Sequence, residues 1–382
     1  MSRPITAPQN DRPDSAVAAP SLFSLNLAQT VALGARLSLA KPRAARTLKR
    51  VLAKFPARDR MRAMHADAGL TVPALMIVSL TRQCNLSCTG CYAGTTQCGS
   101  GKEMDAAAFR TLLAEAEQLG VTTVMLAGGE PLLRQDLLDV AAECRNTLFA
   151  VFSNGTLFDD DAIGFFQANA HIVPVLSLEG SETQTDARRG EGTHAAVLRA
   201  MRSLHDAGCL FGTSITVTTE NLGVAVSDAF LSDLAARGAD VVFHVEFVPQ
   251  HEQEMPLALD EREKSFLSGL QDRLTRRHRM PVIAFPGDET EYGGCLAAGR
   301  GFLHVGVDGS LTACPFSSAS DANVTTAGLR NALASPLLRV IRAHHGELME
   351  VRGGCALAGR QADVEAWLHQ DRAVSPLPVS SR

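Results

Sequence analysis

The sequence predicts an α/β fold, because short apolar segments alternate with amphipathic ones along residues 74–248. Six runs rich in β-branched residues occur at 74–80, 121–127, 148–153, 171–178, 211–218 and 241–248. Helical patterns lie between them, near 105–119, 134–145, 159–169, 193–207 and 225–237. This alternation indicates parallel βα units. Because six units are present and nothing requires eight, we expect a partial (β/α)6 TIM-like barrel whose post-strand loops build the active site.

The segments on either side of the barrel differ from it in character. Residues 1–20 are rich in Pro, Ala and polar residues, a composition typical of disorder. After the barrel, helical patterns near 259–279, 327–344 and 360–370 flank a Gly- and Cys-bearing region. The expected parts are a disordered tail (1–20), a basic helical N-terminal segment (21–70), the barrel (71–255) and a separate C-terminal domain (256–382).

The N-terminal segment is strongly basic. From Ser15 to Arg58 there is no acidic residue, while the basic residues are Arg36, Lys41, Arg43, Arg46, Lys49, Arg50, Lys54 and Arg58. Leu48, Val51 and Phe55 recur at helical spacing, so amphipathic helices are expected. Two interpretations stay open: surface helices packed on the barrel, or helices that contact a membrane surface or an acidic partner.

Composition excludes several classes of function. The net charge is −5, with one Trp and two Tyr, so neither charge nor aromatic content favours a nucleic-acid partner. No apolar run approaches the roughly 20 residues that cross a bilayer, and the N-terminus lacks a secretory signal pattern. Nine cysteines are an odd number and fit a disulfide framework poorly. We therefore expect a cytoplasmic protein whose cysteines bind metal or do redox chemistry.

The first expected strand runs into a cysteine-rich loop. Cys84, Cys88 and Cys91 have Cys-x3-Cys-x2-Cys spacing directly after residues 74–80. Such a loop can wrap a compact iron–sulfur cluster and direct three thiolates to it. Three ligands on four irons leave one iron open to chelate a co-substrate. Zinc is the alternative, but structural zinc sites usually close with four ligands, and the nearest fourth candidate, Cys98, lies seven residues further on.

Polar motifs end the next three expected strands. Gly128-Gly129-Glu130-Pro131 follows the second strand; paired glycines let the backbone approach a ligand, and the carboxylate can accept from an ammonium group. Simple turns or solvated loops are the alternative interpretation of these motifs. The remaining motif residues are Ser153 and Asn154 after the third strand, Ser177 and Glu179 at the fourth, and Asp186, Arg188, Arg189 and Gly190 beyond it.

Together these motifs resemble those of the radical S-adenosylmethionine (SAM) superfamily, and most closely the branch that carries a C-terminal cluster domain of the SPASM or Twitch type. The resemblance covers residues 74–250 and, more loosely, 285–360. It implies a 4Fe–4S cluster on Cys84, Cys88 and Cys91, with the GGEP motif at the SAM amino group and Arg189 at its carboxylate. The implied SAM-binding residues are Tyr92, Gly128, Gly129, Glu130, Ser153, Asn154, Ser177 and Arg189.

Two positions depart from the family pattern, and one of them is Glu179, which stands where Asp is more usual. The residue before the third cysteine is commonly aromatic in the family, whereas here it is Gly90, and the aromatic residue, Tyr92, follows the cysteine. The departure at Gly90 concerns packing of the adenine and leaves cluster binding unaffected.

The late cysteines resemble the opening of a SPASM or Twitch domain. Cys295, Cys314 and Cys355 are the candidates, with a hairpin expected from 302–307 and 311–314 about Asp308-Gly309. Too few cysteines are present for two auxiliary clusters, so the resemblance implies one auxiliary 4Fe–4S cluster at most. Its fourth ligand is left open between Cys98, substrate and water. The alternative is three buried free thiols.

The resemblance implies reductive cleavage of SAM to a 5′-deoxyadenosyl radical, which abstracts hydrogen from a substrate. That substrate, a peptide or protein or a cofactor or metabolite precursor, is not identified by the sequence. A flavodoxin or ferredoxin would supply the electron. The alternative from another class is a noncatalytic iron–sulfur electron carrier or scaffold, which has no use for the motifs at the strand ends.

Overall fold

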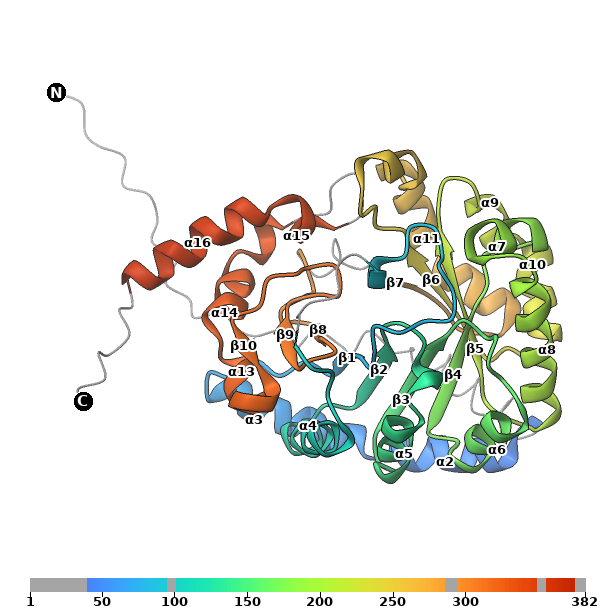
Figure 1. Ribbon diagram of the computed structural model, residues 1–382, viewed down its shortest axis with the longest axis horizontal. Coiled ribbons are helices and arrows are strands. Elements are labelled where there is room, and N and C mark those ends of the chain that lie inside the picture. The colour runs from blue at the N-terminus through green and yellow to red at the C-terminus, as the bar shows by residue number, and fades with distance from the viewer. Residues whose placement is uncertain (1–39, 95–100, 286–293, 349–354, 375–382) are drawn as a thin grey trace.

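The computed structural model describes residues 40–94, 101–285, 294–348 and 355–374. The expected tail, residues 21–39 of the basic segment, and Cys98 lie outside these ranges. The described chain is built on one ten-stranded sheet with the order β10-β9-β8-β1-β2-β3-β4-β5-β6-β7. Figure 1 shows the sheet curving into a partial barrel, with helices along its outer side.

The six predicted strands are confirmed, each within two residues at either end. They are β1 (Leu75–Ser79), β2 (Thr123–Ala127), β3 (Leu148–Ser153), β4 (Ile172–Ser177), β5 (Gly212–Val217) and β6 (Val241–Glu246). Neighbouring strands pair in parallel throughout. Because parallel strands end at the same edge, the loops after β1 to β6 gather at one mouth of the barrel.

The connecting helices also follow the predicted pattern. They are α4 (Ala106–Leu119), α5 (Gln135–Glu143), α6 (Asp160–Ala168), α8 (Thr193–Asp206) and α10 (Asp228–Ala236). Local capping fixes several ends: Asp105 and Asp159 accept from backbone N–H groups at the starts of α4 and α6, as N-cap residues do. Their buried faces supply Phe109, Leu137 and Phe166 to the core between helices and sheet.

A seventh parallel strand was not predicted. The charged helix α11 (Glu261–His278) leads into β7 (Val282–Phe285), which pairs with β6. Only four residues long, β7 lacks the extended apolar run that marked the other strands. The ring of Phe285 lies 5.3 Å from the ring of Phe302 on β8. Side chains from β7 and β8 therefore meet, although β7 is an edge strand and the barrel is not closed by backbone hydrogen bonds in the described chain.

The C-terminal region continues the same sheet. β8 (Phe302–Val305) pairs in parallel with β1, and β9 (Ser310–Thr312) returns antiparallel to β8, as expected for a hairpin about Asp308-Gly309. β10 (Ala322–Asn323) extends this edge. The boundary expected at 255/256 stays a prediction, since the sheet runs across it.

The helix expected near 327–344 is divided into three. α12 (Val324–Ala327), α13 (Leu329–Leu333) and α14 (Pro336–Ala343) are separated by Gly328, with φ +75°, and by the Ser335 cap ahead of Pro336. Glycine at positive φ and proline at a first helical turn both interrupt a continuous helix. α15 (Ala356–Gly359) and α16 (Gln361–Val374) follow.

Two N-terminal helices lie across the opposite end of the barrel. α2 (Pro42–Leu52) is preceded by its N-cap residue Lys41, whose Nζ lies 2.6 Å from Oδ2 of Asp240, just before β6. α3 (Phe55–Asp67) carries Arg58, which donates to the carbonyl of Val121, just before β2, at 2.8 Å. These contacts confirm packing on the barrel for both helices. No described helix is both long and apolar enough to cross a membrane.

Candidate active site

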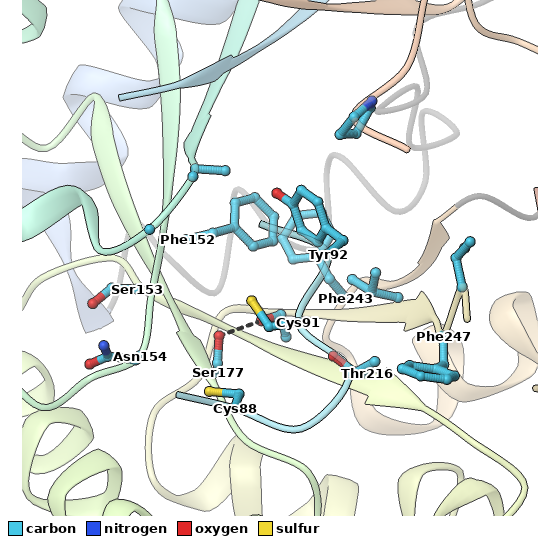
Figure 2. Close-up of a pocket in the computed structure, with 18 of the residues that line it drawn as sticks. Cys88, Cys91, Tyr92, Phe152, Ser153, Asn154, Ser177, Thr216, Phe243 and Phe247 are labelled. Atoms are coloured by element: carbon cyan, nitrogen blue, oxygen red, sulfur yellow. Dashed lines mark hydrogen bonds between the residues drawn. The ribbon is translucent and has the colours of Figure 1, made fainter. Parts of the chain in front are cut away.

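A cavity of ≈ 200 Å³ opens among the loops at the mouth of the barrel. Figure 2 shows Cys88, Cys91 and Tyr92 along one loop of this cavity, with Ser153 and Asn154 from the end of β3 on its other side. All eleven residues expected in the barrel site line it: Cys84, Cys88, Cys91, Tyr92, Gly128, Gly129, Glu130, Ser153, Asn154, Ser177 and Arg189. The motifs that follow separate strands are thus brought to one place.

The loop after β1 carries three free thiols. Cys84 is exposed, and its sulfur accepts from the backbone N–H of Leu86 at 3.5 Å and from Nδ2 of Asn154 at 3.8 Å. Cys88 is half-buried; burial raises the pKa of its thiol, while the positive charges of Arg189 and Arg188 oppose that increase. Nearby cations and N–H donors favour thiolates, so the surroundings suit metal-binding sulfur.

The Gly128-Gly129 turn holds this loop by backbone contact. Gly129 N–H donates to the carbonyl of Thr81 at 2.7 Å, and Glu130 N–H donates to that of Gln83 at 2.8 Å. A Cβ atom on Gly129 would stand 2.0 Å from the Gln83 oxygen, and Gly128 has φ +112°. The paired glycines therefore allow close approach of two protein loops, which is a role the sequence did not reveal.

The carboxylate of Glu130 joins the ends of β2 and β3. It is 1% exposed, and it accepts from Ser153 Oγ at 2.8 Å, from Asn154 N–H at 2.8 Å and from Leu132 N–H at 3.1 Å. Burial raises the pKa of Glu130, while these bonds and the charge of Arg189 act in the opposite direction. Three of its roughly four acceptor positions are occupied, so one is left for a ligand.

Asn154 links the third strand's loop to the cysteine loop. Besides contacting the Cys84 sulfur, its Nδ2 donates to Oδ1 of Asn85 at 2.8 Å. Its own Oδ1 accepts from the Thr156 N–H at 2.9 Å, and Asn85 donates to the Thr156 hydroxyl at 2.7 Å. This network orients Asn154, which supports the position of Cys84 as outer partners support metal ligands.

Glu179 organises the arginines of the D-x-x-R-G motif. These arginines end α7 (Glu182–Arg189), a short helix opened by a Ser181–Gln184 capping box and absent from the predicted elements. Oε1 of Glu179 lies 2.6 Å from Arg188 Nη1 and 2.6 Å from Arg189 Nη2. Burial alone would raise the pKa of Glu179, but the charges of Arg189 and Arg188 outweigh it and lower the pKa. Two guanidinium groups on one carboxylate leave a net positive charge beside Cys88.

The position of Phe247 explains why the residue before the third cysteine is Gly90 and not an aromatic residue. Gly90 has φ +65°, and a Cβ there would lie 2.6 Å from the Phe247 ring. The ring, which follows β6, thus fills the space that a side chain before the third cysteine would occupy. Tyr92 lies elsewhere in the cavity, with its ring edge-on to Phe316 at 5.2 Å. Burial raises the pKa of the Tyr92 phenol, and proximity to Cys91 and Cys314 raises it further.

The rest of the cavity wall is apolar and was not predicted. Besides Tyr92, its aromatic residues are Phe152, Phe243, Phe247, Phe285 and Phe316. Ser177 is at the wall too, with its hydroxyl 3.2 Å from that of Ser214, the contact dashed in Figure 2. Alternating apolar positions on strands mark a buried face, but they do not distinguish core from cavity.

The C-terminal cysteines form a second group outside the cavity lining. A hydrogen bond with Cys355, burial and the proximity of Cys295 all raise the pKa of Cys314 well above its ordinary value. The three candidates are therefore neighbours. Pro315 and Phe316, directly after Cys314, line the cavity, so this group adjoins the mouth of the barrel.

A buried hydrogen-bond chain connects β1 to Cys314. Ser79 Oγ lies 2.9 Å from His304 Nε2, and His304 Nδ1 lies 2.8 Å from Thr312 Oγ1. Thr312 donates to the carbonyl of Cys314 at 3.2 Å. Since a hydroxyl has one proton, Thr312 accepts from Nδ1–H, and Nε2 accepts from Ser79. Burial lowers the pKa of His304 to about 4, consistent with this neutral tautomer.

The three thiols of the loop after β1 fit the ligand set of an iron–sulfur cluster. Within the described ranges, no three His, Cys, Asp or Glu side chains are close enough to hold one metal ion. A zinc site brings its thiolates to about 2.3 Å from a single centre. A four-iron cluster binds each thiolate through a different iron, and three free thiols on one loop beside an arginine pair fit that requirement.

Comparison with known proteins supports the same assignment. Residues 78–223 match the family model of the Radical SAM superfamily. Fe-coproporphyrin III synthase of Methanosarcina barkeri is 29% identical over 151 residues, which cover 39% of this chain and only 38% of that protein. Mycofactocin maturase MftC of Mycobacterium ulcerans is 26% identical over 326 residues, 76% of this chain and 85% of that protein.

A solved structure has the same fold. Streptococcus suis SuiB, in its crystal structure with the precursor peptide SuiA, aligns with a TM-score of 0.59 at 17% identity, covering 78% of this chain and 75% of that one. The family match, which includes the cysteine loop and the strand-end motifs, identifies residues 78–223 as a radical SAM domain.

Proposed function

We propose that this chain is a radical SAM enzyme that modifies a peptide. The observation that carries the proposal is the convergence of three free thiols, the GGEP turn and the Glu179–arginine group on one cavity. A 4Fe–4S cluster bound by Cys84, Cys88 and Cys91 would supply one electron to SAM and so generate the 5′-deoxyadenosyl radical. A flavodoxin or ferredoxin is the proposed electron donor.

The side chains around the thiols have distinct proposed roles. The remaining acceptor position of Glu130 and the Gly128-Gly129 backbone would receive the SAM amino group, and the positive charge near Arg189 would favour its carboxylate. Ser177 would face the ribose. Phe247, in the space above Gly90, would pack against the adenine in place of the family's usual aromatic residue. The apolar wall would exclude water from the reacting carbon.

We also propose an auxiliary 4Fe–4S cluster on Cys295, Cys314 and Cys355. The mutual effect of these thiols on the pKa of Cys314 supports their proximity. With three protein ligands, the fourth would be Cys98, water or the substrate itself. Eight described cysteines are free, and a reducing, cytoplasmic location would keep them so.

The peptide substrate is favoured by the relatives and by the cavity. MftC is named a maturase and SuiB was crystallised with a precursor peptide. The M. barkeri relative is named for a coproporphyrin product, so a tetrapyrrole is the second candidate. A tetrapyrrole with several carboxylates needs several cations, whereas the two cavity arginines share Glu179 and leave one net positive charge, which the SAM carboxylate would take. An uncharged peptide side chain suits the aromatic wall better.

Production of 5′-deoxyadenosine tests the proposed activity. Protein reconstituted without oxygen and given SAM and dithionite should form 5′-deoxyadenosine, and Cys88→Ala should form none. The matched control is Cys144→Ala. Cys144 is a half-buried cysteine at the C-terminal end of α5, and it does not line the cavity. Absence of 5′-deoxyadenosine from cluster-loaded wild-type protein would favour the noncatalytic carrier instead.

A further inference from the structure

The outer faces of α2 and α3 carry more basic than acidic side chains, since the exposed acids there are Asp59 and Asp67 of α3. Six basic side chains are exposed there: Arg43, Arg46, Lys49, Arg50, Lys54 and Arg60. We call these six residues the basal cluster. None of them forms an ion pair with an acidic side chain in the part of the chain that the structure describes. The whole chain has a net charge of −5, so the concentration of positive charge is local.

Packing against the barrel does not account for the basal cluster. The cations used for packing are different ones: Lys41 pairs with Asp240, and Arg58 pairs with Glu117 at 2.6 Å. Ala44 and Val51 form the buried stripe of α2, on the side away from the basal cluster. These contacts fix the helices, and they leave the six cations facing solvent.

Helix stability does not account for it either. Arg43, Arg46 and Arg50 follow one another at spacings of three and four residues, where like charges repel. The first turn of α2 contains no acidic residue, so Arg43 also stands near the positive end of the helix dipole. Such an arrangement is unfavourable for an isolated helix, and an anionic partner would relieve it.

We propose that the basal cluster binds the surface of an anionic lipid membrane. Arg60 lies one turn from Met64, which is 70% exposed, and basic residues beside an exposed apolar side chain are typical of interfacial helices. Each basic side chain near such a surface strengthens binding roughly fivefold.

The orientation that follows leaves the cavity accessible. α2 and α3 contact residues that precede β2 and β6, whereas the cysteine loop follows β1 at the other end of the barrel. Binding through the base would therefore direct the mouth away from the lipid. This inference does not depend on the chemistry proposed for the mouth.

Sedimentation with lipid vesicles tests the proposal on the full-length protein. Wild-type protein should bind vesicles of phosphatidylcholine with 30% phosphatidylglycerol about tenfold or more tightly than pure phosphatidylcholine vesicles, and 0.5 M salt should release it because salt screens surface charge. Replacing Arg43, Arg46, Arg50 and Lys54 by Glu should reduce the binding at least tenfold. The same four positions changed to Gln should give a smaller loss, which separates charge from any effect of Glu on folding.

The matched control carries four substitutions on helices elsewhere in the fold. Arg199, Arg202, Arg262 and Arg273 are exposed on α8 and α11, and changing them to Glu alters the net charge equally. This control should bind as the wild type does. Equal loss in the control, equal binding to both vesicle types, or binding to polyglutamate without binding to anionic vesicles would each overturn the proposal.

Discussion

Glu130 is a single side chain that ties together the ends of two strands. Glu130→Ala would leave the hydroxyl of Ser153 and the N–H of Asn154 without their acceptor in a buried site. Because unsatisfied buried donors cost about 1–3 kcal/mol each, we expect the free energy of unfolding to fall by about 2–4 kcal/mol. Urea denaturation measures this, with Glu182→Ala on an exposed position as the control. Equal stability of Glu130→Ala and wild type would contradict the structural role.

His304 makes stability depend on pH. Its pKa is lowered to about 4 in the folded protein by burial, whereas an unfolded histidine has a pKa of about 6.5. The unfolded chain therefore binds the extra proton between these values, and stability falls as the pH drops from 6.5 towards 4. We expect this one group to remove about 2 kcal/mol between pH 7 and pH 5. His304→Gln should lose less stability over that interval, as measured by denaturation at both pH values; an identical loss would contradict the assignment.

Individual site residues could be predicted from the sequence only where they belong to a short local motif. The cysteines and the GGEP residues follow strands directly, so their common edge was predictable from parallel topology. The contact between Gly90 and Phe247, and the double pairing of Glu179, join segments far apart in the chain. Local patterns contain no information about which distant side chains meet.

The contact of the GGEP turn with the cysteine loop is a property of two elements. Gly129→Ala would place a methyl group 2.0 Å from the Gln83 carbonyl, so one loop must move. We expect this variant to retain markedly less iron after anaerobic reconstitution and to lose about 1–3 kcal/mol of stability. Gly164→Ala is the control, since nothing lies within 4 Å of the added methyl group. Wild-type iron content in Gly129→Ala would show that the contact is dispensable.

The elements themselves were predicted unevenly. β1 to β6 have apolar, β-branched sequences that identify strands, and their ends agree closely with the structure. α7 was missed although its Ser181–Gln184 capping box is readable in the sequence. The breaks at Gly328 and Pro336 were likewise indicated by residue type. β7 is too short for its pattern to be distinctive.

At the scale of the molecule, one sheet joins the radical SAM domain to the C-terminal cysteines. β8 pairs with β1 across more than 220 residues of sequence, and the Ser79–His304–Thr312 chain crosses the same junction. No local pattern could predict this pairing. It holds the two groups of cysteines at one end of the barrel, while the basal cluster lies at the other.

The central claim is that SAM binds an iron left open by Cys84, Cys88 and Cys91. Electron paramagnetic resonance on the dithionite-reduced protein tests it most directly, in a variant with Cys295, Cys314 and Cys355 changed to Ala so that one cluster remains. The account predicts the signal of a reduced 4Fe–4S cluster whose shape and g values change when SAM is added. A loaded cluster whose signal SAM leaves unaltered, or zinc in place of iron, would contradict it.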